Sequence, residues 1–322
     1  MTSEPLLEVK NLKVHFSSKK MFKEPMTVHA VDGVNFSIEK GKTLGIVGES
    51  GSGKTTTALA VLRLVSITEG EITLSGKKIS HLEKEELRLA RRHFQMIFQD
   101  PYSSLDPRCR VGDIVREPLD LMNIGDPDQR DQKVKDLFEQ VGLRPESISL
   151  FPHQFSGGQR QRVGLARALA TEPDLIVCDE PVSALDVAVQ AQILNVMRRL
   201  QEKMGLTYLF ISHDLGVVQH LCDDVAVMYL GQIVEKADRK TLFTNPKHPY
   251  TKALLAAVPR VHANPEAVRR NALTGDPPSP INLPKGCRFA GRCPVAIEHC
   301  ASEPPPLKDW GDGHLASCHF LT

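Results

Sequence analysis

Apolar and polar residues follow two different patterns in this sequence. Near the start, residues 6–16 and 29–42 alternate between apolar and polar positions, which predicts two half-buried strands at a sheet edge. Further on, short apolar runs are separated by segments with apolar residues three and four apart, a pattern typical of buried parallel strands joined by helices. The apolar runs lie at residues 43–47, 94–98, 174–178 and 207–212. This order predicts an α/β fold with a mostly parallel sheet and an antiparallel β edge.

The chain divides into regions of different pattern. Residues 1–98 and 161–240 carry the strand and helix alternation and form the predicted α/β core. Residues 99–160 are dominated by helical periodicity, which predicts a helical insertion. Residues 241–322 begin with a predicted helix over 247–260 and then become rich in proline and cysteine, which predicts an irregular C-terminal extension.

Composition mainly excludes functions. The 322 residues carry 40 Lys and Arg against 39 Asp and Glu, so no overall basic field favours nucleic acid, and we expect no nucleic-acid partner. No stretch approaches the roughly 18 apolar residues of a membrane span, and the first residues lack a signal-peptide core. We therefore expect a cytosolic protein whose association with a membrane depends on partners.

A glycine-rich loop connects the apolar run at 43–47 to a predicted helix. Gly48, Gly53, Lys54 and Thr55 fill the pattern GxxxxGK[ST], in which glycines let backbone N–H groups wrap a phosphate at a helix N-terminus. Lys54 would reach the β- and γ-phosphates, and the Thr55 hydroxyl would hold Mg²⁺. The alternative is a plain glycine turn between strand and helix.

Acidic and imidazole side chains follow two later apolar runs. Asp179 and Glu180 end the run DLIVC, at the strand end where ligands bind in parallel α/β sheets. Asp179 would support Mg²⁺ and Glu180 would polarise the attacking water; two solvated acids are the alternative. His213 follows the next strand and would bond a γ-phosphate or cap the following helix. Phe16 could stack on an adenine ring or lie in the core.

The segment FSGGQ opens a long amphipathic stretch. Ser156 occupies a helix-capping position before Gly157 and Gly158, and the glycines would leave the first N–H groups of the helix bare. The segment therefore predicts a second anion site. An ordinary capped helix is the alternative.

Several of these motifs occur in an order that resembles the ATP-binding cassette (ABC) ATPase family over residues 7–240. They are GESGSGKT, Gln99 after an apolar strand, FSGGQ, LIVCDE, SALD and His213. The resemblance implies a RecA-like ATPase core with a helical subdomain, and it implies that Gln99 senses the γ-phosphate and Mg²⁺. It further implies that two cassettes sandwich two ATPs, so that Ser156, Gly157 and Gly158 complete the site of a partner and Asp186 lies at the shared interface. The ATP-binding residues implied are Phe16, Gly48, Ser50, Gly51, Ser52, Gly53, Lys54, Thr55, Thr56, Ser156, Gly157, Gly158, Gln159 and Asp186.

Segments downstream resemble the ATPase subunits of dipeptide and oligopeptide importers, closest to the F-type of their two paired ATPases. These segments include FPHQFSGGQRQR, DEPVSALDVAVQAQILN and NPKHPYTKALLAAVP. The resemblance implies a second, paralogous ATPase subunit, two membrane permease subunits and an extracytoplasmic substrate-binding protein, with the chain at the cytoplasmic face of the inner membrane. The alternatives are an importer ATPase for nickel or other small solutes, a soluble ABC ATPase without a transport role, and a non-catalytic binding or redox module.

Four of the seven cysteines are confined to the extension, at Cys287, Cys293, Cys300 and Cys318. Grouped cysteines in a reducing compartment are more often metal or cluster ligands than disulfides. The resemblance to the cysteine-bearing extension of peptide-importer ATPases implies a [4Fe-4S] cluster held by four thiolates. Tetrahedral Zn²⁺, which usually uses shorter spacings, and unliganded thiols are the alternatives. His299, His314 and His319 could each replace a ligand.

Overall fold

The computed structural model describes residues 4–18, 26–100, 102–257, 275 and 278–321. These residues form two compact units, each assembled from separate stretches of chain. The first unit contains residues 1–7, 38–43 and 73–211, and the second contains residues 8–37, 44–72 and 212–322. The predicted boundaries at residues 98, 160 and 240 follow motif content, so they stay a prediction.

The first unit contains three parallel strands in the order β8-β7-β6. They are β6 (Phe94–Ile97), β7 (Leu175–Asp179) and β8 (Thr207–Ser212). Every residue of β7 and β8 is buried, which explains why both strands are continuous apolar runs in the sequence. A two-residue strand, β5 (Lys77–Lys78), pairs antiparallel with the end of β4.

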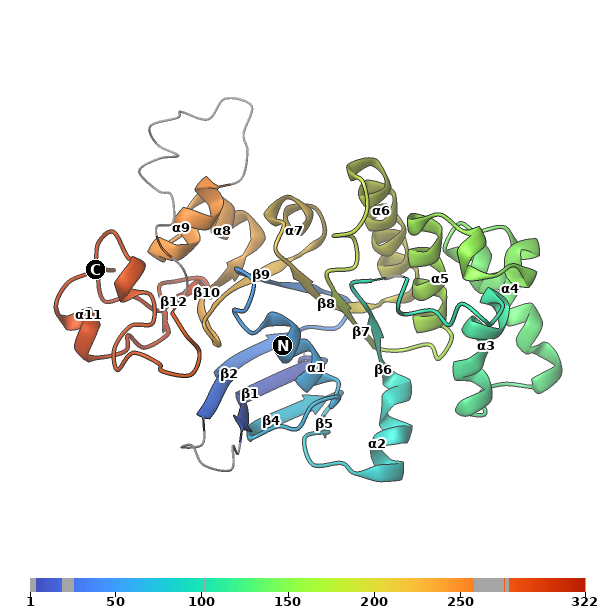
Figure 1. The fold of residues 1–322 in the computed structure, drawn as a ribbon, viewed down its shortest axis with the longest axis horizontal. Coiled ribbons are helices and arrows are strands. Elements are labelled where there is room, and N and C mark those ends of the chain that lie inside the picture. Colours follow the sequence, from blue (N-terminus) through green and yellow to red (C-terminus); the bar gives the residue numbers. More distant parts are fainter. Residues whose placement is uncertain (1–3, 19–25, 101, 258–274, 276–277, 322) are drawn as a thin grey trace. The chain divides into compact units, whose positions relative to one another are not determined.

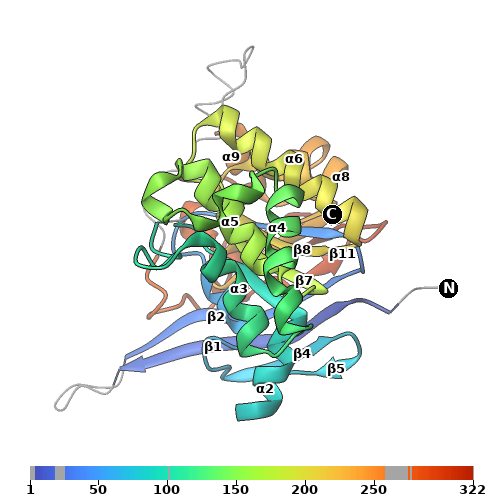
Figure 2. The ribbon, with the colours of Figure 1, turned by 90° about the vertical axis from the view of Figure 1, so that its right-hand side faces the viewer.

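The described residues of this unit also form five α-helices. They are α2 (Lys84–Ala90), α3 (Val111–Leu121), α4 (Arg130–Gln140), α5 (Gly157–Leu169) and α6 (Val187–Met204). In α3, the buried residues Val111, Ile114, Val115 and Leu119 recur at the three-and-four spacing seen in the sequence. Helices α3, α4 and α5 pack on one another, and Figure 2 shows them as a group. The helical character predicted for residues 99–160 is thus present.

The second unit contains an antiparallel layer with strand order β2-β1-β4, visible side by side in Figure 1. Its strands are β1 (Leu7–Ser18), β2 (Met26–Ile38) and β4 (Glu69–Leu74). A second set of strands runs β11-β12-β10-β9-β3, in which β3 (Thr43–Val47) and β9 (Asp224–Tyr229) are parallel. The remaining pairs, with β10 (Gln232–Asp238), β12 (Leu315–Ala316) and β11 (Lys308–Asp309), are antiparallel. The expected combination of parallel strands with antiparallel edges is confirmed.

The described residues of the second unit form five α-helices. They are α1 (Lys54–Val61), α7 (Leu215–Leu221), α8 (Arg239–Thr244), α9 (Pro249–Ala256) and α11 (His299–Ser302). The helix expected over residues 247–260 is α9, and residues 258–260 of that prediction lie outside the described residues.

The C-terminal extension is held to the rest of the second unit through a buried carboxylate. Glu235 on β10 is fully buried, and its carboxylate accepts hydrogen bonds from the backbone N–H groups of Lys247 and His248. His314 Nε2 lies 2.7 Å from the same carboxylate, and β12 pairs with β10 beside it. Burial lowers the pKa of His248 to about 3, so that ring is neutral. The extension, although rich in proline, is therefore held by an added strand and by polar bonds to one carboxylate.

Candidate functional site

The phosphate loop lies in the second unit, between the end of β3 and the start of α1. Gly53 occupies the N-cap position with φ 103°, and a Cβ at this position would meet the carbonyl oxygen of Ala30 at 2.2 Å. The left-handed conformation and this close approach both require glycine. No side chain caps α1. A bound anion can take the place of the missing cap at the positive end of the helix.

Two side chains of the loop indicate that it binds an anionic ligand. The Lys54 side chain is buried, and its Nζ donates to the carbonyl oxygens of Gly48 and Glu49, both at 2.8 Å. Ser52 Oγ is buried and, among the described residues, has no hydrogen-bond partner. An unpaired buried hydroxyl is costly, so a phosphate oxygen at the loop would satisfy it. Ser50, Gly51 and Thr55 are exposed, and Thr56 is half-buried.

His213 shares a cavity with the phosphate loop. The cavity has a volume of about 340 Å³, and its walls include Val47, Gly48 and His213. Asp214 caps α7 by accepting a hydrogen bond from the N–H of Gly216 at 2.7 Å. The capping role considered for His213 is thus filled by its neighbour, and the imidazole belongs to the cavity wall.

Phe16 lies near the end of β1 and is 47% exposed. The alternative of a core phenylalanine therefore fails, and the ring is accessible for stacking. The neighbouring His15 lies 3.0 Å from a carboxylate oxygen of Asp32 and 3.2 Å from Nδ1 of His29. These three side chains fix the strand next to Phe16.

The first unit brings together two of the predicted catalytic residues. Strands β6 and β7 are parallel, with Ile97 opposite Cys178, so the residues that follow both strands meet at one sheet edge. Gln99 Nε2 donates to Glu180 Oε2 at 3.0 Å. Asp179, the last residue of β7, is 5% exposed. All three residues thus lie at the carboxyl ends of parallel strands, where ligands commonly bind in α/β sheets.

Glu180 has an uncommon backbone conformation, with φ 47°. Its N–H donates to the carbonyl oxygen of Ile211 at 3.0 Å, and its carbonyl accepts from the Ser183 hydroxyl at 3.0 Å. A non-glycine residue in the left-handed region persists only where surrounding bonds hold it, and such residues cluster at functional sites. In this conformation the Glu180 carboxylate accepts the hydrogen bond from Gln99.

The FSGGQ segment forms the N-terminus of α5. Ser156 and Gln159 make a reciprocal capping box, in which the Gln159 N–H donates to Ser156 Oγ at 3.4 Å and the Ser156 N–H donates to Gln159 Oε1 at 2.9 Å. A Cβ at Gly158 would meet Val189 Cγ1 at 2.3 Å, so this glycine lets α5 approach the start of α6. Asp186 caps α6 by accepting from the Val189 N–H at 3.0 Å. Gly157 is half-buried, whereas Ser156 and Asp186 are exposed.

The four cysteines of the extension lie near enough to one another for the charges of their thiolates to interact. Cys287 donates its backbone N–H to the carbonyl oxygen of Cys300 at 2.7 Å. Burial raises the pKa of Cys287, and the charges of Cys300 and Cys318 raise it further. Burial likewise raises the pKa of Cys293, as do the charges of the other three thiols. Such thiols become thiolates readily only when a cation binds.

The candidate histidine ligands of the extension have other partners. His314 is buried against Glu235, and His319 Nε2 lies 2.9 Å from the carbonyl oxygen of Glu303. His299 Nε2 lies 3.5 Å from the Glu303 carboxylate. The four thiols therefore stay the candidate ligand set.

The sequence analysis did not single out Arg292 or Glu49. Arg292 Nη1 donates to Glu49 Oε2 at 2.7 Å, and Nη2 donates to Oε1 at 3.0 Å, so the extension contacts the phosphate loop directly. The available signal was the segment CRFAGRC, which places two arginines beside two of the predicted cysteine ligands.

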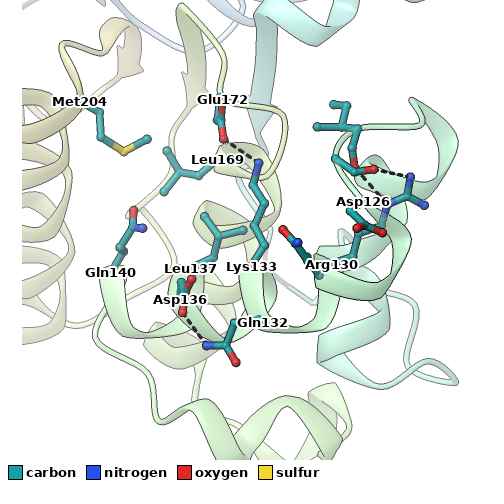
Figure 3. Close-up of a pocket in the computed structure, with 13 residues that line it drawn as sticks. Asp126, Arg130, Gln132, Lys133, Asp136, Leu137, Gln140, Leu169, Glu172 and Met204 are labelled. Carbon is teal, nitrogen blue, oxygen red and sulfur yellow. Dashed lines mark hydrogen bonds and ion pairs between the residues drawn. The ribbon is translucent and has the colours of Figure 1, made fainter.

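Another cavity, of about 490 Å³, lies along α4 in the first unit (Figure 3). None of the predicted site residues lines it. Its charged residues are paired within the unit: Lys133 lies 2.6 Å from Glu172, and Arg130 lies 2.7 Å from Asp120. Since these cations are already neutralised, the cavity carries no anion site comparable to the phosphate loop.

The fold and the loop together define a class of protein. A glycine loop that connects a parallel strand to a helix, with a buried lysine folded over it, is the structure of phosphate-loop nucleotide-binding proteins. None of the helices that the structure describes has the length and apolar character needed to cross a membrane.

Comparisons with known proteins specify this class further. Residues 31–183 match the family described as ABC transporter, and residues 234–300 match the family described as oligopeptide/dipeptide transporter, C-terminal region. The oligopeptide transport ATP-binding protein AppF of Bacillus subtilis is 49% identical, covering 99% of this chain and 98% of its own. The dipeptide transport ATP-binding protein DppF of Haemophilus influenzae is 48% identical, covering 98% and 97%.

Solved structures agree with the sequence relatives. A dimeric ATP-binding cassette, MJ0796, in a post-hydrolysis state with ADP and Pi, matches with a TM-score of 0.64 and 29% identity, covering 72% of this chain and 98% of its own. CbiO1 from Clostridium perfringens matches with a TM-score of 0.65 and 25% identity, covering 76% and 92%. The chain therefore belongs to the ABC transporter family of ATP-binding proteins. The predicted fold class is confirmed.

Proposed function

We propose that this protein binds and hydrolyses ATP to power the uptake of dipeptides and oligopeptides through separate membrane proteins. The observation that carries the proposal is near-full-length similarity to proteins named for oligopeptide and dipeptide transport, which includes the C-terminal region at residues 234–300. A similarity confined to the cassette would support ATP binding without indicating the solute.

ATP binding is assigned to the phosphate loop and to Phe16. Lys54 would exchange its two loop carbonyls for phosphate oxygens, and Ser52 Oγ would gain a partner. The exposed face of Phe16 would stack on the adenine ring. The proposed loop contacts are Gly48, Ser50, Gly51, Ser52, Gly53, Lys54, Thr55 and Thr56.

Hydrolysis is assigned to Glu180, with Gln99 and His213 in support. The Glu180 carboxylate would accept a proton from the attacking water, and the hydrogen bond from Gln99 would hold it in position. Thr55, Gln99 and Asp179 would provide oxygen ligands of the kind that Mg²⁺ prefers, and the bound ion would neutralise charge on the phosphates. His213 would bond the γ-phosphate.

A second cassette is part of the proposal. Ser156, Gly157, Gly158, Gln159 and Asp186 would face the ATP held by the phosphate loop of the partner, as the motif match implies. The exposure of Ser156 and Asp186, and of Val187 at 81%, supports a surface that meets another molecule. We propose that the partner is a paralogous chain.

The remaining partners would place the protein at a membrane. We propose that two permease subunits dock against the helical insertion at residues 99–160, and that a substrate-binding protein delivers peptide on the opposite side. The chain would then lie at the cytoplasmic face of the inner membrane, attached through the permeases. Exposed apolar side chains in the insertion, Tyr102 at 63% and Leu121 at 70%, support a docking surface there.

We also propose that Cys287, Cys293, Cys300 and Cys318 hold a [4Fe-4S] cluster. The confinement of four cysteines to one segment supports the proposal, because grouped thiols in a reducing compartment are more often metal or cluster ligands than disulfides. Bound iron would also favour the thiolate forms of Cys287, Cys293 and Cys318, whose pKa values burial raises.

The transport proposal is tested on the assembled complex. The chain is co-purified with its permeases in lipid, and ATP hydrolysis is measured with the binding protein loaded with dipeptides, oligopeptides or Ni²⁺. We expect peptides to stimulate turnover. Stimulation by Ni²⁺ alone would transfer the protein to the small-solute importers.

The cluster proposal is tested by analysis of protein purified without oxygen. We expect about four iron and four sulfide per chain, and loss of both in Cys293→Ser. Cys109→Ser, which changes an exposed cysteine outside the group, is the matched control. Stoichiometric zinc without sulfide would contradict the cluster.

A further inference from the structure

Residues 287–293, with the sequence CRFAGRC, contact the phosphate loop through a bidentate ion pair. The two terminal guanidinium nitrogens of Arg292, Nη1 and Nη2, donate to the Glu49 carboxylate at 2.7 and 3.0 Å. The Arg292 side chain is 7% exposed and that of Glu49 is 28% exposed. Paired parallel bonds of this kind are strong and fix orientation. Glu49 directly follows Gly48, the first glycine of the loop.

The main chain of Glu49 is held as firmly as its side chain. Its N–H donates to the Tyr250 hydroxyl at 2.9 Å, and its carbonyl accepts from Lys54 at 2.8 Å. Arg292 also donates to the Tyr229 hydroxyl at 3.3 Å. Arg292 and Tyr250 thus hold this loop residue from outside the loop.

Phe289 anchors the CRFAGRC segment between the two tyrosines. It is 1% exposed, and its ring centroid lies 5.3 Å from that of Tyr229 and 5.4 Å from that of Tyr250. Buried aromatic rings in such edge and tilted contacts have little freedom to move. The position of Arg292, three residues along the chain, is therefore fixed by packing.

Arg288 braces the loop from a second direction. It donates to the carbonyl oxygen of Leu230 and forms an ion pair with Asp32. Gly231, which follows Leu230, donates its N–H to the carbonyl oxygen of Ser52 in the phosphate loop at 2.8 Å. Its own carbonyl oxygen accepts from the Asp32 N–H at 2.8 Å. Arg288 therefore supports the turn that holds the far end of the loop.

The charge of Glu49 makes Arg292 important for binding. A carboxylate in the phosphate loop repels a triphosphate unless a cation neutralises it. Arg292 neutralises it with a fixed geometry and, being charged at all accessible pH values, does so permanently. We propose that Arg292 is a positioning residue for ATP binding, and that the C-terminal extension is thereby a working part of the nucleotide site.

This inference rests on the proposed function, in which the phosphate loop receives ATP. It is independent of what the four cysteines hold. It gives the extension a task in the cassette itself, because any event that displaces the CRFAGRC segment would release Glu49 and weaken the binding of nucleotide.

The test measures ATP affinity of the full chain, and KM and kcat of the assembled complex. Arg292→Gln should weaken ATP binding about tenfold, as expected for loss of a charge-assisted pair, and raise KM with little change in kcat. Arg292→Lys should recover part of the affinity, since the charge is kept and the fork is lost. In a Glu49→Gln background, Arg292→Gln should change affinity less than about twofold, because no charge is left to neutralise.

The matched control is Arg88→Gln, which breaks a similar fork to Glu85 on α2 and should leave ATP affinity unchanged. Thermal unfolding without nucleotide checks that each variant is folded. Should Arg292→Gln not fold, Arg292→Lys in the presence and absence of Glu49→Gln decides the question.

Wild-type affinity in Arg292→Gln, or equal losses with and without Glu49→Gln, would overturn the inference. These outcomes differ from failure of the proposed function, in which the unaltered protein itself would not bind ATP.

Discussion

Two helices of this protein begin with glycine-containing segments of the kind that bind anions, and they begin in different ways. Helix α1 follows Gly53, which adopts φ 103° and offers no capping side chain. Helix α5 follows Ser156, whose hydroxyl and N–H are both engaged with Gln159. The start of α1 is thus shaped for a ligand before one arrives, whereas the start of α5 already satisfies itself. An anion can bind at α5 only by replacing part of its cap.

This difference predicts separate roles for the N-termini of α1 and α5. The phosphate loop also contains a buried lysine, so it can hold a triphosphate by itself. The tip of α5 has no such cation at its cap and needs a nucleotide already held elsewhere. The proposed pairing of cassettes would therefore separate ATP binding, which needs one chain, from hydrolysis, which needs two.

The largest effect is expected from Glu180→Gln. Turnover of the assembled complex should fall about 10²- to 10⁴-fold, the usual contribution of a general base, while ATP affinity is retained. The matched control is Glu139→Gln, an exposed acid on α4. Normal hydrolysis by Glu180→Gln would remove Glu180 from the role of base.

The second effect concerns the phosphate loop alone. Lys54→Met should weaken ATP binding by the isolated chain about 10- to 100-fold, because a charge-assisted hydrogen bond to phosphate contributes about 1.5–3 kcal/mol. Equilibrium binding of a fluorescent ATP analogue measures the change. Lys77→Met, on the exposed strand β5, is the control. Equal loss in both variants would show a nonspecific effect of charge.

The sequence predicted the features that depend on local pattern. The continuous apolar runs LIVCD and TYLFIS are buried parallel strands because both faces of such strands are covered. The place of Asp179 and Glu180 at the end of a buried strand follows from the apolar run before them. The capping position of Ser156 follows from its place before the glycines.

Features that depend on distant pairing were missed. Arg292 and Glu49 are 243 residues apart, and neither belongs to a pattern of fixed spacing. The added strand β12 was also missed, because a two-residue strand in a proline-rich segment is set by its partner β10 and not by propensity. The exposure of Phe16 could not be decided from an alternating strand that ends near it.

A smaller effect separates the glycines of the two helix starts. Gly53→Ala should destabilise the protein by about 2 kcal/mol or more, since it combines a left-handed conformation with a clash against the backbone of Ala30. Gly158→Ala meets a methyl group of Val189, so α5 and α6 must shift slightly apart, but its backbone is helical and alanine favours the helix. Its loss should therefore be smaller than that of Gly53→Ala. Urea unfolding of both variants gives the comparison, and equal losses would contradict it.

The smallest effect is expected at the cap of α5. Ser156→Ala should lower the free energy of unfolding by about 1 kcal/mol, the usual cost of losing a capping hydroxyl. Asp238→Ala, which removes the comparable cap of α8, should cost a similar amount. The two variants should differ in function, because only Ser156 lies at the proposed site of a partner.

Hydrolysis by the assembled complex and ATP binding by the isolated chain, measured on both variants, resolve that difference. Ser156→Ala should lower turnover several-fold and leave the affinity of the isolated chain unchanged, whereas Asp238→Ala should change neither. Since the two caps are energetically alike, a loss of turnover confined to Ser156→Ala cannot come from stability. It would mean that the α5 tip acts on a nucleotide held by another chain. A matching loss of ATP affinity in the isolated Ser156→Ala chain would instead place both anion sites on one nucleotide.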